Sequence, residues 1–248
     1  MTVYLMPLVL SSAISGMLGF YSWQQRTTPS KIFAVLMLTL SAWALGYTLE
    51  LRASTLEMKI IWENIIRMLY AAVPVLMLLF VIQYTGRAKI FPERRGLLLF
   101  IIPAITSLLG WTNSSHELVE RNIKMITAGP LQALSTTNGP WFYVHAAYSY
   151  ALLFACAILL AISVMGASYI FRRQLLTLLL ALVVPFGLNI IYVAGFRLVT
   201  EGYDPTPVVF SISGMMTAWG MFRYRVLNLI PIARDLIVES LGSAPSMA

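Results

Sequence analysis

The sequence predicts an all-α membrane protein, a bundle of seven transmembrane helices. The chain has 248 residues, of which 59% are hydrophobic and only 11% charged, whereas soluble domains carry about 25% charged residues. Seven apolar stretches reach or approach the ~20 residues that a helix needs to cross the hydrocarbon core. Little of the chain remains for a separate soluble domain, so we expect a multi-pass protein of the plasma membrane.

The seven spans follow one another with short breaks. We place them at residues 3–23, 32–51, 59–84, 96–111, 140–170, 174–195 and 207–221. Turn-forming sequences separate them, for example Phe91-Pro92 and Asp204-Pro205. Pro140 and Pro207 stand where a helix can begin with proline at its first position. The fourth and seventh spans are the shortest.

Charge at the ends of the spans predicts their orientation. Eleven Lys and Arg residues lie at one set of ends and five at the other, with Arg67 inside the third span. Cytoplasmic ends are enriched in Lys and Arg, so we expect the N-terminus outside and the C-terminus in the cytoplasm. These residues stand singly or in pairs between apolar runs, as membrane topology would place them. Membrane topology therefore accounts for the net charge of +7. We therefore expect membrane lipids as neighbours and no nucleic acid as a partner.

The longest connection, residues 112–139, is external in this topology. Residues 119–127 partly alternate polar and apolar side chains, a Gly129-Pro130 break follows, and residues 131–136 have an extended pattern. The loop can form a short β-hairpin over the mouth of the bundle, or it can be irregular.

Polar residues inside the spans mark the candidate site. An ionised side chain at mid-helix costs about 2.5–3.5 kcal/mol on insertion scales, so such residues face the bundle interior and find partners. Glu63 and Arg67 share one helix face because they are four residues apart. The predicted ligand-binding residues are Glu63, Arg67, Trp141, His145, Tyr148, Asn189, Tyr192 and Asp204, with Tyr70 and Ser211 in the same layer.

Two interpretations of this layer stay open. The residues form a structural network around a Glu63–Arg67 ion pair, or they line an outward-facing ligand cavity. Aromatic walls with few charges favour a compact, partly apolar ligand. We expect that ligand to be neutral or singly anionic, because the deepest charge is an arginine.

The cytoplasmic half of the spans is nearly free of polar groups. Residues 74–81 include none, and residues 175–184 include only Thr177. A channel or carrier needs polar groups or broken helices along its whole path. This pattern favours a pocket that binds its ligand from outside the cell. A seven-helix transporter or channel is the alternative.

Other chemistries find no support in the sequence. The four lysines stand at span ends or in loops, which argues against a retinal Schiff base. No metal-ligand spacing, phosphate-binding loop or nucleophile motif is present. We expect neither an enzyme activity nor a metal or other cofactor.

Several short motifs together resemble a known family. They are Tyr84-Thr85, Gly139-Pro140-Trp141-Phe142, Arg173-Gln174 with Pro185 and Asn189, Asp204-Pro205-Thr206-Pro207, and Pro231-Ile232-Ala233-Arg234-Asp235. In order and spacing they resemble the N-terminal seven-transmembrane sensor region of bacterial and archaeal histidine kinases, over nearly the whole chain. The resemblance implies a sensor of a small ligand that works as a homodimer. It also implies that the last helix signals to a cytoplasmic PAS or histidine-kinase output domain, in the same chain or a separate one.

The resemblance also implies a domain division. Residues 1–222 would be the sensor domain, and residues 223–248 a cytoplasmic connector helix to an output domain that this chain lacks. Apolar residues recur at helical spacing from Val226 to Leu241, which fits a coiled coil or an amphipathic helix on the membrane surface.

Overall fold

The computed structural model describes residues 2–88, 93–128, 131–193 and 206–223. Its helices are α1 (Thr2–Gln24), α2 (Thr28–Arg52), α3 (Leu56–Tyr84), α4 (Glu93–Leu98), α5 (Ile101–Trp111), α6 (Pro140–Met165), α7 (Tyr169–Val193) and α8 (Thr206–Arg223). Within these ranges five helices are long and apolar enough to cross a membrane, namely α1, α2, α3, α6 and α7. The mostly helical class is confirmed, whereas the count of seven spans and their orientation stay predictions.

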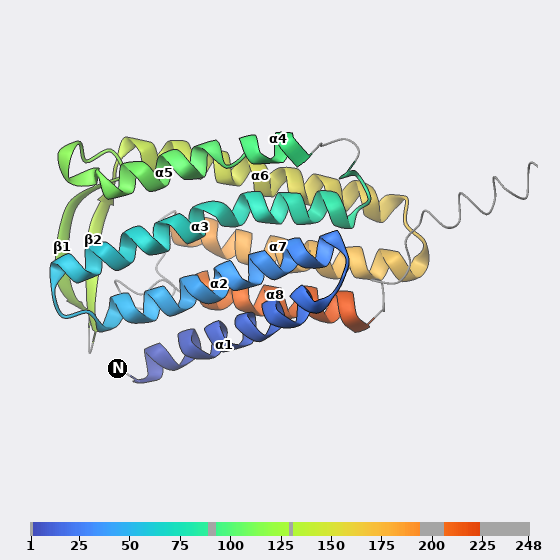
Figure 1. The fold of residues 1–248 in the computed structure, drawn as a ribbon, viewed down its shortest axis with the longest axis horizontal. Helices are drawn as coiled ribbons and strands as arrows, with labels where there is room; N and C mark the ends of the chain where they lie inside the picture. Colours follow the sequence, from blue (N-terminus) through green and yellow to red (C-terminus); the bar gives the residue numbers. More distant parts are fainter. Residues whose placement is uncertain (1, 89–92, 129–130, 194–205, 224–248) are drawn as a thin grey trace, which may run out of the picture.

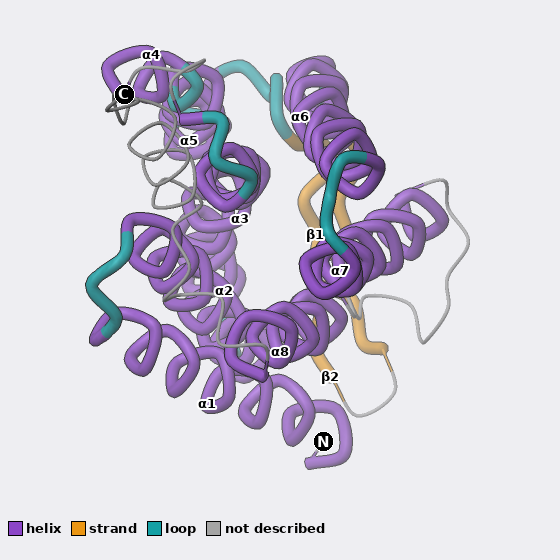
Figure 2. Tube along the Cα trace, turned by 90° about the vertical axis from the view of Figure 1, so that its right-hand side faces the viewer, coloured by secondary structure: helices purple, strands orange, loops and turns teal. Residues whose placement is uncertain are grey.

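The helices lie roughly parallel to one long axis (Figure 1). α1, α2 and α3 pack in sequence, as do α6, α7 and α8, while α3 also packs against α5 and α6, and α1 against α8 (Figure 2). The core runs along α2 and α3, with Phe33, Met37, Val75 and Phe80 among its buried side chains. α1 leaves large apolar side chains exposed, as a lipid-facing helix does: Met6, Leu10, Met17 and Phe20.

The two ends of the bundle differ in their loops and charges. At one end α3 begins, α5 ends and a two-stranded sheet lies across the helices; we call it the hairpin end (Figure 1). α1 begins at this end, and α8 finishes at the opposite one. The opposite end carries Arg26, Lys31, Arg87, Arg172 and Arg173, and we call it the basic end.

The connection over residues 112–139 contains a β-hairpin, the first of the two alternatives for this segment. Strand β1 (Glu120–Ala128) pairs antiparallel with β2 (Leu131–Asn138). The register shifts between Arg121 and Lys124, where Asn122 has a positive φ of 52°. Such a bulge bends the strand locally.

Gly139 joins the hairpin to α6. A Cβ at this position would lie 2.2 Å from the carbonyl oxygen of Leu118, so no larger residue fits. The amide of Gly139 donates to the oxygen of Val119 at 2.8 Å, and that of Trp141 donates to the oxygen of Leu118 at 2.9 Å. These bonds fix the start of α6 beneath the hairpin.

The fourth predicted span is not one helix. The sequence predicts a continuous helix over residues 96–111, but α4 ends at Leu98 and α5 begins at Ile101. Pro103 explains the break, because it has no N–H to donate to the carbonyl of Leu99. That carbonyl accepts a hydrogen bond from the Tyr148 hydroxyl at 2.7 Å instead.

The boundary between the fifth and sixth spans also differs from the prediction. The predicted span 140–170 is too long, because α6 ends at Met165 with Gly166 as its C-cap. α7 begins at Tyr169, five residues earlier than predicted. The guanidinium of Arg173 lies over the Tyr169 ring, 4.6 Å from its centroid, which supports this first turn.

Candidate functional site

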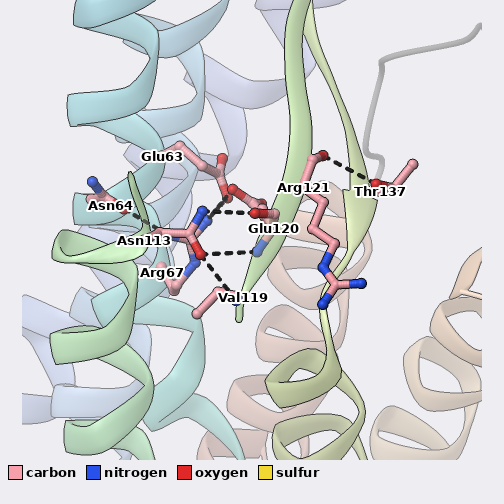
Figure 3. Close-up of polar contacts among 8 residues, drawn as sticks. All are labelled: Glu63, Asn64, Arg67, Asn113, Val119, Glu120, Arg121 and Thr137. Atoms are coloured by element: carbon pink, nitrogen blue, oxygen red, sulfur yellow. Dashed lines mark hydrogen bonds and ion pairs between the residues drawn. The ribbon is translucent and has the colours of Figure 1, made fainter. Parts of the chain in front are cut away.

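Arg67 is the central charge of the candidate site, and its side chain is only 1% exposed. Its Nη1 donates to Oδ1 of Asn64 at 2.6 Å. Its Nη2 lies 3.3 Å from Oε1 of Glu63 and 2.8 Å from Oε2 of Glu120. Glu63 and Asn64 stand one turn earlier on α3, whereas Glu120 belongs to strand β1 (Figure 3). The predicted Glu63–Arg67 pair is therefore present, and Arg67 also ties α3 to the hairpin.

Two residues at the end of α5 shape this contact. A Cβ on Gly110 would lie 2.7 Å from Nη1 of Arg67, so a glycine is needed for α5 to pass this close. Asn113 follows α5 and holds the start of β1 (Figure 3). Its Nδ2 donates to the oxygen of Glu120 at 2.7 Å, and its Oδ1 accepts from the amides of Val119 and Glu120 at 3.0 and 3.2 Å. The backbone of Glu120 is thereby held where its carboxylate meets Arg67.

A second buried ion pair lies between α2 and α3. The Nζ of Lys59 is 3.0 Å from Oε1 of Glu50, and the two side chains are 0% and 4% exposed. Lys59 also donates to the carbonyl of Glu50 at 2.7 Å, in the last turn of α2, where this oxygen accepts from the amide of Ala53 at 3.0 Å as well. From the sequence, Lys59 was predicted only as a charge at a span end. The sequence indicates this pair only by an acidic residue before the short α2–α3 loop and a basic residue after it.

His145 belongs to a hydroxyl network between α5 and α6. The Thr106 hydroxyl donates to the oxygen of Ile102 at 2.8 Å, so it acts as an acceptor toward its other neighbours. Those neighbours are Nε1 of Trp141 at 2.9 Å and Nδ1 of His145 at 3.2 Å. His145 therefore carries its proton on Nδ1, and its Nε2 accepts from the Ser149 hydroxyl at 3.3 Å. Both nitrogens of a neutral imidazole are used.

Tyr70 lies between the two clusters. It stands three residues after Arg67 on α3, and its ring centroid is 6.1 Å from that of His145. Its other aromatic neighbour is Trp43 of α2, at 5.8 Å. Trp43, which was not among the predicted residues, therefore packs beside Tyr70.

The remaining candidate residues have other partners. Tyr148 bonds the free carbonyl at the α4–α5 break, as described above. Asn189 accepts from the Tyr150 hydroxyl at 3.1 Å and donates to Oγ1 of Thr206 at 3.5 Å, which links α6, α7 and α8. The Ser211 hydroxyl accepts from Ser15 of α1 at 3.0 Å. Asp204 and the side chain of Tyr192 lie outside the described residues.

Within the described residues, the polar layer is therefore divided into several separate local networks. The structure brings together Glu63 with Arg67, and Trp141 with His145, but it gives Tyr148 and Asn189 separate partners. Glu120, Thr106 and Tyr150 complete these networks and were not predicted. Thr106 and Tyr150 are polar residues inside the predicted spans 96–111 and 140–170 that were not singled out, whereas Glu120 lies in the loop between these spans, where no pattern marks a buried polar contact.

Comparison with known proteins places almost the whole chain in one family. A family model described as the N-terminal 7TM region of histidine kinase matches residues 7–231. No curated protein matches the chain.

Proposed function

The chain belongs to the family of N-terminal 7TM regions of histidine kinases, and on this basis we propose that it senses a small ligand at the hairpin end of the bundle. The sensing region itself is non-catalytic. The proposed output runs through α8 and residues 223–248 to a cytoplasmic PAS or kinase domain, in the same chain or a separate one.

The observation that carries the proposal is the contact of Arg67 with Glu120. This ion pair joins a helix of the bundle to the hairpin across its end, at 2.8 Å and with Arg67 fully buried. A ligand can shift a protein between two states only as far as it binds them differently. A ligand that binds beneath the hairpin changes this contact directly. Its binding energy can thereby shift α3 relative to the hairpin.

The charges around Arg67 define the ligand class that we propose. Two carboxylates, those of Glu63 and Glu120, face one guanidinium, so the cluster has a formal charge of −1. His145 adds no positive charge in the tautomer given above, because its Nε2 accepts a hydrogen bond from Ser149 and so carries no proton. The expectation of a neutral or singly anionic ligand counted Arg67 without Glu120. We propose a compact ligand that is neutral or carries an amine, held against Tyr70 and Trp141.

The basic residues support the proposed orientation. Among the described residues, eight Lys and Arg stand at the basic end by their place in the elements and four at the hairpin end, so on the positive-inside rule the basic end faces the cytoplasm. The eight are Arg26, Lys31, Arg87, Arg94, Arg95, Arg172, Arg173 and Arg223, and the four are Arg52, Lys59, Arg121 and Lys124. The hairpin and the candidate site then lie outside, as a sensor requires. In this arrangement seven spans cross the plasma membrane, with α4 and α5 together making the fourth, and two copies of the chain form the signalling unit.

The buried surface favours a sensor over a transporter. Toward the basic end, α2, α3 and α8 line a cavity of about 10 Å³ whose walls are mostly apolar, with Phe33, Met37, Phe80 and Phe210, and whose polar side chains are Ser213 and Thr217. This volume holds about one water molecule. A transport path would need a polar lining there.

A thermal-shift screen of the purified chain tests the proposal. Small amines, alcohols and acids of partly aromatic character are the probes, and we expect amines or alcohols to raise the melting temperature. The shift should be lost in Glu120→Gln and kept in Glu117→Gln, a matched change of an exposed residue three positions earlier. Stabilisation by acids alone would overturn the ligand class, and equal shifts in both variants would overturn the site.

Coupling to an output is tested separately. The chain is placed before a histidine-kinase output domain in place of that kinase's own sensor region, and autophosphorylation is measured with and without a stabilising compound. A compound that binds but leaves phosphorylation unchanged would contradict the sensor function.

A further inference from the structure

Unpaired buried polar atoms gather at one end of the described bundle. Within the described residues, four side chains bury a polar atom without a hydrogen-bond partner: Ser22, Arg67, Tyr84 and Gln174. Three of these, all except Arg67, stand at the basic end. Buried polar atoms are nearly always paired, and exceptions can mark stored strain. At the hairpin end, hydrogen bonds and ion pairs join the helices and the hairpin. We therefore expect the strain of this conformation mainly at the opposite end.

Tyr84 and Gln174 flank one contact between α3 and α7. Tyr84 is the last residue of α3, and its ring stacks on Phe171 at a centroid distance of 6.0 Å and an angle of 25°. Gln174 follows Phe171 by three residues, which places both on the same side of α7. Gln174 is 1% exposed, and both its amide oxygen and its amide nitrogen are unpaired. The hydroxyl of Tyr84 is buried and unpaired as well.

The two side chains are chemically complementary. A phenol hydroxyl can donate to an amide oxygen, and an amide N–H can donate to a phenol oxygen. We propose that Tyr84 and Gln174 form a switch contact: they are unpaired in the described conformation and bond to each other in a second conformation, in which α7 is shifted against α3. This inference rests on the proposed function in that the second conformation is taken as the other signalling state.

The first test is the stability of two variants of the full chain. Tyr84→Phe and Gln174→Leu remove the unpaired polar atoms with little change in shape. Each should raise the melting temperature by about 2–6 °C, because a buried polar group without a partner destabilises the fold. Tyr150→Phe is the control, since it removes a hydroxyl that bonds Asn189 at 3.1 Å and should lower the melting temperature. A lower melting temperature for Tyr84→Phe and Gln174→Leu would show that both groups already have partners, and would overturn the proposal.

The second test measures the two conformations directly and needs no ligand. Spin labels at Arg87→Cys and Ser168→Cys, in a Cys156→Ala background, report the distance between the ends of α3 and α7. We expect two distance populations in the otherwise unchanged chain, and the loss of one of them in Tyr84→Phe and in Gln174→Leu. A single unchanged distance in all three chains would refute the switch contact. A ligand screen without hits would contradict the proposed function but leave this result intact.

Discussion

Replacement of Arg67 by alanine is the sharpest test of the candidate site. The substitution removes the guanidinium that holds Asn64, Glu63 and Glu120 together. Breaking a buried ion pair by removing one partner costs about 3–5 kcal/mol. The side chains of Glu63 and Glu120 are 24% and 16% exposed, so water screens part of the uncompensated charge. We therefore expect a loss at the lower limit, about 3 kcal/mol.

The assay is thermal unfolding of the purified chain in detergent or nanodiscs. A loss of this size should lower the melting temperature by about 6–12 °C for a chain of this length. Arg121→Ala is the matched control, because this exposed arginine on the same hairpin makes only a side-chain bond to the oxygen of Glu117. The control should stay within about 0.5 kcal/mol of the original chain. Equal melting temperatures for the two variants would refute the argument that Arg67 fastens the hairpin to α3.

Two further predictions concern the surroundings of the site. Gly110→Ala should lower the stability by about 1–3 kcal/mol, because the added Cβ would lie 2.7 Å from Nη1 of Arg67. Gly187→Ala, where the added Cβ meets nothing within 4 Å, should not lower it, and thermal unfolding of both variants compares them. Tyr148→Phe leaves a carbonyl unpaired at the α4–α5 break and should cost about 1 kcal/mol by the same assay. The exposed Tyr143→Phe serves as its control, and an equal effect of both would contradict the role of the Tyr148 hydroxyl.

The helices were predictable because lipid imposes length and apolarity on every span. The break between α4 and α5 was visible in principle, since Pro103 stands inside the fourth apolar run. The hairpin could be predicted only as one of two alternatives, because its alternation of polar and apolar residues is incomplete and a bulge interrupts it.

Within the site, the sequence predicted the contacts between residues of the same helix. Glu63 and Arg67 are four residues apart, so helical geometry alone brings them together. Glu120 is 53 residues further along the chain than Arg67, and only the tertiary fold brings it to 2.8 Å. The same holds for Tyr150 and Asn189, which meet across two helices. Contacts between elements depend on register and tilt, and no periodicity in one sequence encodes these.

α3 is the helix through which the two ends of the proposed sensor can communicate. It carries Arg67 at the hairpin end and Tyr84 at the basic end, 17 residues apart and thus about 25 Å along the axis. Between them Pro74 removes the N–H that would bond the carbonyl of Tyr70, which makes this turn the easiest place for the helix to bend. At Tyr84, α3 contacts α7 through the ring stack on Phe171, and α7 packs on α8. A change at the Arg67–Glu120 contact can therefore reach α8 through packed elements alone, without a polar path across the membrane.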